Sequence, residues 1–250
     1  MGDMLADATL AGTFRQSGLP VPAYLKSIYW WAYVHPRAVY VFERQWLVNL
    51  ILFGNFGRLR DMAIRFLEPR LAGRTLQIAC VYGNLTNRLA ALVPEEGQLD
   101  VLDVLPVQIE NLQNKLPAGH RVGLIHGDSS RLDMVASGSY DQALLFFLLH
   151  EQPEEVRRAT LAEALRVLRP GGRLVIIDYH RPREKHPLRW VMKQILRRFE
   201  PFAMDLWQRP VSDWFPAGGK VCVHSHQLLF GGLYQVLEVT AADVAHQQTP

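Results

Sequence analysis

From residue 75 onward, short apolar runs alternate with segments in which hydrophobic residues recur every three or four positions. The short runs fit buried strands, and the longer spacing fits amphipathic helices. The predicted strands cover residues 75–81, 98–104, 121–126, 141–148 and 173–179, and the predicted helices cover 84–93, 106–115, 154–168 and 186–200. This alternation predicts repeated βα units around a parallel sheet.

The strongest helical pattern is "PEEVRRATLAEALRVL", which begins at Pro153 and has two glutamates in its first turn. Proline and acidic residues favour a helix N-terminus. The turn "RPGG" follows, and two further strands are predicted around Gly231 and Gly232. We therefore expect an α/β fold with a mostly parallel, seven-stranded sheet and helices on both faces.

Residues 1–74 differ in character because they are rich in aromatic residues and are broken at His35-Pro36. We expect a helical cap over residues 1–74, an α/β domain over 75–240 and a loose tail over 241–250. The cap could be purely structural, or its aromatic residues could form a mouth for an apolar substrate or a membrane contact. The aromatic candidates are Tyr24, Tyr29, Trp30, Trp31 and Tyr33.

The helix predicted at 186–200 is locally basic and has an apolar stripe. The stripe consists of Leu188, Val191, Met192, Ile195, Leu196 and Phe199. We expect this stripe to be buried on the sheet, and we expect any membrane contact to come from part of residues 20–55.

The composition of the chain argues against several classes of protein. The chain has 250 residues, 49% hydrophobic and 20% charged, which excludes a disordered chain and a polytopic membrane protein. A net charge of +3 with dispersed Lys and Arg does not suggest a nucleic-acid partner. Cys80 and Cys222 form no CxxC pair, which fits a reduced, cytosolic compartment. No signal peptide is recognised at the N-terminus, and "QWLVNLILFGNF" is too short and too interrupted to span a bilayer.

Polar residues follow each predicted strand, at the edge where ligands bind in an open parallel sheet. Asp103 follows the second strand, where a carboxylate can accept hydrogen bonds from ribose hydroxyls, and Asp128 follows the third, where it can reach an adenine amino group. Either aspartate could instead cap the following helix. Two acids at successive strand ends favour an adenosine-type site.

These residues, with "HGDSS", "YDQALLFFLLHEQ" and "LRVLRPGGRLVIIDY", resemble the Rossmann-like class I S-adenosylmethionine-dependent methyltransferase fold over roughly residues 60–240. In that family the first loop reads approximately acid-x-Gly-x-Gly-x-Gly. Here Gln77 replaces the acid, Ala79 and Val81 replace two glycines, and Gly83 remains. Because glycine permits close backbone approach, we expect Val81 to reshape the methionine end of the site.

The strings "QIACVYGN", "FLLHEQPEEVRRATLAEALRVLRPGG" and "LLFGGLYQVLEV" resemble a narrower family, the RquA proteins of rhodoquinone biosynthesis. The resemblance implies an enzyme at the inner face of the membrane, peripherally attached. It implies replacement of a ubiquinone methoxy group by an amino group, with S-adenosylmethionine as donor and manganese assisting. The implied cofactor-binding residues are Gln77, Ala79, Val81, Tyr82, Gly83, Asn84, Asp103, Val104, Asp128, Ser129 and Leu148.

The chemistry needs a base, for which Tyr82 and His150 are candidates. Carboxylate and imidazole ligands suit manganese, and a metal held mainly by cofactor and quinone oxygens is an equal alternative. The candidate protein ligands are His150, Glu151, Asp178 and His180 at strand ends, with His224-x-His226 as a further pair.

Three other functions stay open. The first is a conventional S-adenosylmethionine-dependent methyltransferase acting on a quinone or lipophilic phenol. The second is a non-catalytic relative that binds the adenosyl ligand or quinone. A nicotinamide-dependent reductase is more distant, because a dinucleotide loop needs glycines that are absent here.

Overall fold

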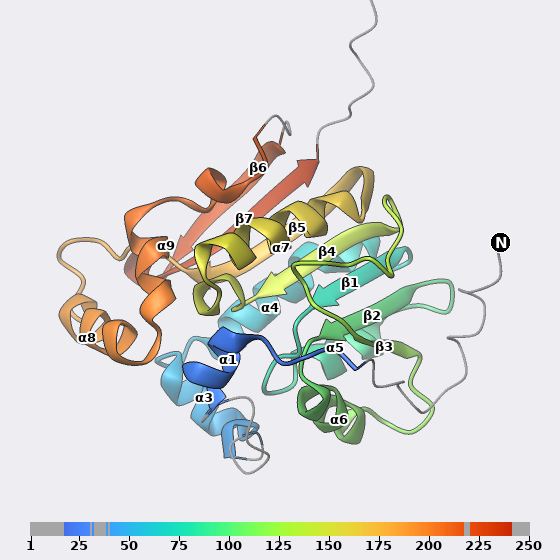
Figure 1. Ribbon diagram of the computed structural model, residues 1–250, viewed down its shortest axis with the longest axis horizontal. Coiled ribbons are helices and arrows are strands. Elements are labelled where there is room, and N and C mark those ends of the chain that lie inside the picture. Colours follow the sequence, from blue (N-terminus) through green and yellow to red (C-terminus); the bar gives the residue numbers. More distant parts are fainter. Residues whose placement is uncertain (1–17, 31, 33–38, 40, 218–220, 242–250) are drawn as a thin grey trace, which may run out of the picture.

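The computed structural model describes residues 18–30, 32, 39, 41–217 and 221–241. Seven strands form one sheet in the order β3-β2-β1-β4-β5-β7-β6 (Figure 1), in which only β7 runs against the others. The strands are β1 (Arg74–Ile78), β2 (Gln98–Asp103), β3 (Val122–His126), β4 (Tyr140–Phe146), β5 (Leu168–Tyr179), β6 (Val221–Leu229) and β7 (Tyr234–Ala241). The predicted α/β fold with a mostly parallel sheet is confirmed.

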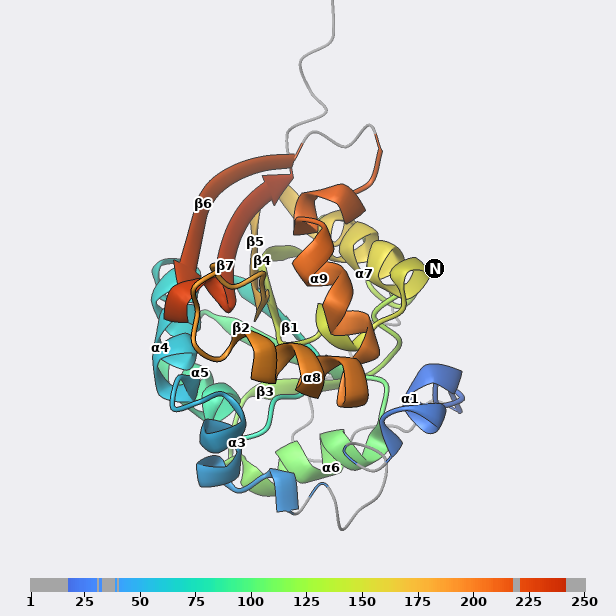
Figure 2. The ribbon, with the colours of Figure 1, turned by 90° about the vertical axis from the view of Figure 1, so that its left-hand side faces the viewer.

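Helices cover both faces of the sheet. The α-helices are α1 (Ala23–Ser27), α3 (Gln45–Ile51), α4 (Phe56–Leu67), α5 (Leu85–Leu92), α6 (Pro106–Lys115), α7 (Glu154–Arg166), α8 (Arg189–Phe199) and α9 (Asp205–Gln208). The edge-on view in Figure 2 shows α4 and α5 on one face of the sheet and α7 and α9 on the other. The central strands are buried on both faces, which explains their continuous apolar runs.

Predicted and observed strands differ by a few residues, except at β5. This strand begins at Leu168, which pairs with Tyr140 before a register shift at the "RPGG" turn. The preceding helix α7 ends at Arg166 instead of residue 168. The sequence signal for a turn is correct, but the sheet pairs residues on both sides of it.

The N-terminal segment comprises the described residues before α3, which are 18–30, 32, 39 and 41–44. It lies at the carboxyl ends of the strands, where Leu25 and Tyr29 pack against Leu105, just after β2. Tyr29 is fully buried, whereas 54% of Trp30 is exposed. Trp31 and Tyr33 lie outside the described residues, as do residues 242–250 of the predicted tail. Ala241, its first residue, ends β7.

The apolar stripe of helix α8 was expected to be buried on the sheet, but it is buried only in part. Met192 and Leu196 are buried, but Val191, Ile195 and Phe199 of the same apolar stripe are exposed, and so is Trp190. Only the side of α8 that carries Met192 and Leu196 packs against the rest of the chain, so the other apolar residues of the stripe are not fully covered.

Among the residues that the structure describes, no helix combines the length and apolar character needed to cross a bilayer. Cys80 and Cys222 are both free thiols; Cys80 is partly buried and Cys222 is exposed.

Candidate functional site

A cavity of about 520 Å³ lies at the carboxyl ends of β1, β2 and β4, where the strand order reverses. This position and size are typical of small-molecule sites in α/β proteins. The sheet provides a polar end with Asp103, Asp128 and Ser129. The opposite walls are mainly apolar and come from the N-terminal segment, α3 and α8.

The loop after β1 keeps a glycine-like backbone although it has lost glycines. Ala79 has φ +76° and Gly83 has φ +84°, both in the left-handed region. An added Cβ at Gly83 would lie 2.7 Å from Cζ of Phe56, so glycine is needed there for space as well as conformation. Ala79 and Val81 both line the cavity, as expected, whereas Gly83 does not.

Gln77 was expected beside the cofactor, but the structure places it beneath the loop. Its side chain is fully buried and does not line the cavity. Its Nε2 donates to the carbonyl oxygen of Ala79 over 3.0 Å, and its Oε1 accepts from Thr86 Oγ1 over 3.1 Å. An ionised carboxylate only accepts hydrogen bonds, so it could not make the contact with Ala79. The exchange of acid for amide therefore braces the loop internally.

The phenol of Tyr82 lines the cavity but does not fit the role of a base. Its hydroxyl donates to the carbonyl oxygen of Ala32 and accepts from Gln108 Nε2, each over 2.8 Å. Burial raises the pKa of the Tyr82 phenol well above its ordinary value. Tyr82 instead ties the loop to the N-terminal segment.

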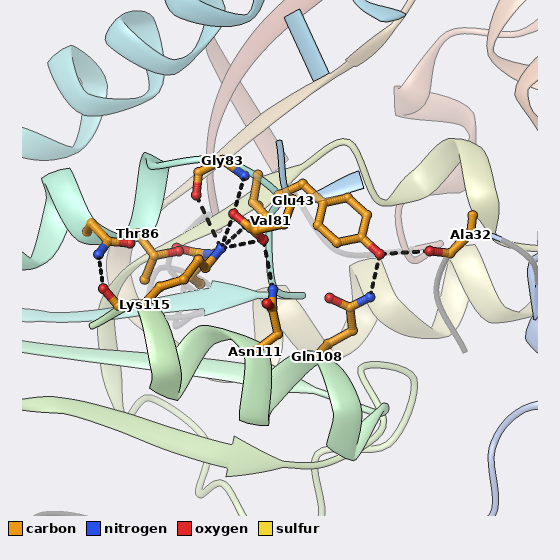
Figure 3. A network of polar contacts seen from close by, with 11 residues as sticks. Ala32, Glu43, Val81, Gly83, Thr86, Gln108, Asn111 and Lys115 are labelled. Carbon is orange, nitrogen blue, oxygen red and sulfur yellow. Dashed lines mark hydrogen bonds and ion pairs between the residues drawn. The ribbon is translucent and has the colours of Figure 1, made fainter. Parts of the chain in front are cut away.

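A second link between these segments involves Glu43 and Lys115 (Figure 3). Lys115 Nζ lies 2.9 Å from both carboxylate oxygens of Glu43, and it also approaches the carbonyl oxygens of Val81 and Gly83 at 3.3 and 3.2 Å. Glu43 in turn accepts hydrogen bonds from the N–H of Gly83 and from Asn111. The ion pair fastens the N-terminal segment over the loop. Asn84, another expected cofactor residue, does not line the cavity and accepts a hydrogen bond from Arg60.

The two aspartates expected at the adenosine end lie in the cavity. Asp103 accepts the N–H of Cys80 over 2.7 Å and that of Leu105 over 2.8 Å, one on each carboxylate oxygen. Burial raises the pKa of the Asp103 carboxyl to about 6, and these N–H groups oppose the rise. Each carboxylate oxygen can accept more than one hydrogen bond, so Asp103 retains capacity for ribose hydroxyls.

Asp128, Ser129, Val104 and Leu148 complete the expected adenosine end, and all four line the cavity. Asp128 Oδ1 accepts from the N–H and the hydroxyl of Ser130. Ser129 Oγ lies 2.9 Å from Thr160 Oγ1 and accepts from Gln152 Nε2. These contacts hold the loop after β3 in place at the carboxyl edge. The residues present therefore fit an adenosyl ligand.

His150 lies on the cavity wall with Asp178 behind it. The two side chains are buried, and His150 Nδ1 is 2.8 Å from Asp178 Oδ1. Burial, the largest single influence, lowers the pKa of His150. The charge and hydrogen bond of Asp178, together with the charges of Glu200 and Glu151, outweigh burial and raise this pKa to about 9. Asp178 also accepts the N–H groups of Leu149 and Tyr179, so its position is fixed. His150 is therefore a buried, positively charged group near neutral pH, which does not suit a resting base.

The four strand-end metal candidates do not converge. Asp178 is turned away from the cavity, and His150 Nε2 lies 3.7 Å from Glu151 Oε1. His180 instead contacts the carbonyl oxygen of Gly232, and burial lowers its pKa. In the described part of the chain, no group of at least three His, Cys, Asp or Glu residues could hold a metal ion. The residues described do not fit a manganese site.

The alternative pair on β6 is separated as well. His224 Nε2 lies 2.8 Å from Thr240 Oγ1, whereas His226 Nε2 lies 3.1 Å from Gln235 Oε1. A register shift between Val223 and Ser225 interrupts the regular alternation from which a shared face was expected.

Glu200 was not predicted as a site residue. It lies directly after α8 and lines the cavity, and burial raises the pKa of its carboxyl. In the sequence it stands at the end of a basic, amphipathic stretch, directly before Pro201, and nothing in that pattern indicates a strand end. Tyr179 was also missed, although its ring centroid lies 4.9 Å from that of His150.

Comparisons with known proteins agree with this geometry. Residues 75–172 match the family model of a methyltransferase domain. The chain is 26% identical over 161 residues to the demethylmenaquinone methyltransferase of Staphylococcus saprophyticus, a match that covers 64% of this chain and 66% of that protein. It is 31% identical over 139 residues to the ubiquinone/menaquinone biosynthesis C-methyltransferase of Syntrophotalea carbinolica, covering 54% of this chain and 56% of that protein.

Among solved structures, the chain is similar to the 1,6-didemethyltoxoflavin-N1-methyltransferase of Burkholderia thailandensis, with bound S-adenosylhomocysteine. The TM-score is 0.52 at 19% identity, over 92% of this chain and 94% of that one. The curated matches span less than two thirds of the relatives' own length. Residues 75–172 thus match a methyltransferase domain, and the sheet that contains them has the class I methyltransferase fold.

Proposed function

We propose that the protein is an S-adenosylmethionine-dependent methyltransferase that acts on the ring of a quinone or another lipophilic phenol. The observation that carries this proposal is one cavity with two chemically different ends, Asp103 and Asp128 at one and apolar side chains of the N-terminal segment, α3 and α8 at the other. Its similarity to two quinone-pathway methyltransferases supports the choice of ring.

Each end has its own role in this proposal. Asp103 accepts the ribose hydroxyls, Asp128 lies by the adenine, and Ala79 and Val81 form the wall beside the methionine portion. S-adenosylmethionine, when bound, supplies an electrophilic methyl group. The reacting ring lies toward His150, and its oxygen accepts a hydrogen bond from the imidazolium.

The charge on His150 has a direct chemical use. A ring carbon becomes a better nucleophile when the adjacent ring oxygen carries negative charge, and a buried cation stabilises that charge. Asp178 holds the imidazole in position through Nδ1, and Nε2, which lies 3.7 Å from Glu151 Oε1, is the nitrogen assigned to the ring. Glu200 lines the same cavity and is the carboxylate assigned to accept the ring hydroxyl proton as the methyl group passes from sulfur to the ring carbon. The proton on the methylated ring carbon then moves to the ring oxygen, which restores the hydroxyl group.

A second candidate is the replacement of a ubiquinone methoxy group by the amino group of S-adenosylmethionine. The altered loop favours it, because Gln77, Ala79 and Val81 depart from the methyltransferase pattern at the methionine end, and the loop strings resemble the rhodoquinone family. No step of this candidate is assigned to manganese. In either case the substrate's apolar tail brings the enzyme to the cytoplasmic surface of a membrane.

The two candidates differ in the mass of the product. Purified protein is incubated anaerobically with S-adenosylmethionine and either a short-tailed demethylated quinol or a short-tailed ubiquinone. We expect a product that is heavier by one methylene from the quinol. Exchange of methoxy for amino in ubiquinone would support the second candidate. Binding of both ligands without any product would indicate a non-catalytic relative.

A further inference from the structure

Helices α3 and α8 form two walls of the cavity and also expose apolar side chains to the outside. α3 contributes Leu47, Val48 and Ile51 to the lining, and α8 contributes Ile195, Leu196 and Phe199. Figures 1 and 2 both show the two helices at the same end of the molecule. On their outward sides Trp46 and Leu50 are 62% and 64% exposed, and Trp190 is 70% exposed.

The cavity reaches the surface between these helices. Among the described residues that line it, Ile51, Ile195 and Phe199 have large exposed fractions, at 44%, 38% and 47%, and the others are buried or half-buried. All three belong to α3 or α8. The mouth of the cavity is therefore apolar and is bordered by the two exposed helix faces.

The apolar side chains of α3 are exposed or only half-buried. In α3, "QWLVNLI" is apolar at most positions, yet the helix contains no buried residue. Soluble proteins rarely expose continuous apolar patches, and such patches mark contacts with membranes or proteins. Exposed tryptophans such as Trp46 and Trp190, on two helices at the same end of the molecule, are typical of side chains that lie at a membrane–water interface.

The positive charge of α8 favours an anionic bilayer over a protein as the partner of this face. The sequence of α8, "RWVMKQILRRF", contains four cationic residues and no acidic one. Arg197 and Arg198 are exposed, and Lys193 is half-exposed. A helix that combines cations with exposed tryptophan and aliphatic residues binds anionic lipid surfaces through both apolar insertion and electrostatic attraction.

We propose that α3 and α8 together form a docking face for an anionic bilayer, with the cavity mouth opening onto the lipid. This inference rests on the proposed function, since it assigns the substrate's apolar tail to the mouth while the ring enters toward His150. A substrate of this kind would remain partly in the membrane during the reaction. The face also explains why α8 leaves part of its apolar stripe uncovered.

The test is sedimentation of the full chain with phosphatidylcholine vesicles, with and without phosphatidylglycerol. We expect binding that increases with phosphatidylglycerol. The variants Trp46→Ser/Leu50→Ser and Trp190→Ser/Val191→Ser should each weaken the partition coefficient by on the order of tenfold. Lys193→Gln/Arg197→Gln/Arg198→Gln should abolish the preference for anionic vesicles. None of these residues lines the cavity.

Leu92→Ser/Val223→Ser is the matched control. Both residues are exposed, at 44% and 50%. Val223 pairs with Val239, which pairs with Leu174, whereas the carboxyl end of β5 at the cavity, Tyr179, pairs with Tyr234, so Val223 lies away from the cavity edge of the sheet. We expect this control to bind vesicles as the unaltered chain does. Equal binding by all variants, or absence of binding to either vesicle, would overturn the proposal. So would a self-association that the α3 variants abolish while vesicle binding is unchanged.

Two further measurements separate this inference from the proposed function. Titration with S-adenosylhomocysteine and turnover of a tail-less quinol should be the same in the α3 and α8 variants as in the unaltered chain. If the tail-less quinol is not converted, the proposed function fails while the vesicle result still stands. If it is converted but the variants bind vesicles normally, only the docking face fails.

Discussion

His150 Nδ1 lies 2.8 Å from Asp178 Oδ1, and both side chains are buried. Asp178 thereby holds a charged imidazole on the wall of the cavity that Asp103 and Asp128 also line. The pair has a consequence for stability that can be measured without substrate.

Burial lowers the pKa of His150, but Asp178, Glu200 and Glu151 together outweigh burial and raise this pKa from 6.5 to about 9. A raised folded-state pKa stabilises the fold fully below the unfolded pKa, and the contribution is lost as pH rises through the folded pKa. We therefore expect the free energy of unfolding to fall by roughly 3 kcal/mol between pH 6.5 and 9.5 because of this residue. Urea unfolding across that window should show the decline, and His150→Gln should remove most of it. A His150→Gln profile parallel to that of the unaltered chain would contradict the assignment.

Asp103 predicts a pH dependence of ligand binding. Its pKa is raised by burial to about 6, so the carboxylate becomes protonated and loses acceptor capacity as pH falls through this value. The affinity for S-adenosylhomocysteine, measured by calorimetry, should decline below about pH 6. Asp103→Asn should bind about tenfold more weakly at pH 7.5 and should lack this decline. An unchanged affinity in Asp103→Asn would remove Asp103 from the ribose site.

Gln77→Glu tests whether the amide is an internal brace. The buried carboxylate would face the carbonyl oxygen of Ala79 without a hydrogen to donate. We expect a loss of about 2–4 kcal/mol in the free energy of unfolding at pH 7.5. Gln194→Glu, at an exposed site on α8, is the control and should change stability by less than about 0.5 kcal/mol. A Gln77→Glu protein as stable as the control would show that the brace is dispensable.

The loop backbone predicts a larger loss of stability at Gly83 than at Ala79. Gly83→Ala places a Cβ 2.7 Å from Phe56 at a positive φ, and should cost about 1–3 kcal/mol of stability. Ala79→Gly relieves a left-handed alanine while adding freedom to the unfolded chain, so it should change stability by less than about 1 kcal/mol. Thermal unfolding of both variants compares them directly. Equal destabilisation would contradict the loop conformation.

The Glu43–Lys115 pair predicts an effect on ligand affinity. Both side chains are largely covered, and Glu43→Gln would remove the charge that holds Lys115 beside Val81 and Gly83. We expect the Kd for S-adenosylhomocysteine to rise about three- to tenfold, with a stability change near 1 kcal/mol. Asp133→Asn breaks the exposed pair with Arg131 and should leave the Kd unchanged. A Glu43→Gln protein with normal affinity would exclude a role for this contact in closing the site.

The strands and the acids at their ends could be predicted because the signals are local. A strand buried on both faces is mostly apolar, which makes it visible in the sequence. The carboxyl ends of parallel strands meet at one edge, so Asp103 and Asp128 could be placed in one site. Positions that depend on packing were not predictable. Gln77 aligns with a ligand-binding acid, yet its side chain turns beneath the loop because Ala79 and Thr86 offer it partners.

Glu200 is a second residue whose place in the site depends on packing and could not be predicted from the sequence. It belongs to no strand end, and it reaches the cavity because α8 packs across the carboxyl edge of the sheet through Met192 and Leu196. The periodicity of α8 predicted an apolar stripe correctly but not how much of it the chain covers. How much of the stripe is buried depends on how α8 packs against the rest of the chain. The spacing of residues along one helix does not determine this packing.

The most direct test of the central claim follows a labelled methyl group. The protein is incubated with methyl-deuterated S-adenosylmethionine and a short-tailed demethylated quinol, and the quinone product is examined by mass spectrometry. We expect the intact deuterated methyl group on the ring carbon of the product, and His150→Gln should strongly reduce its appearance there. An unlabelled product in which an amino group has replaced methoxy, or the absence of label under conditions of saturated cofactor binding, would contradict the proposed methyl transfer.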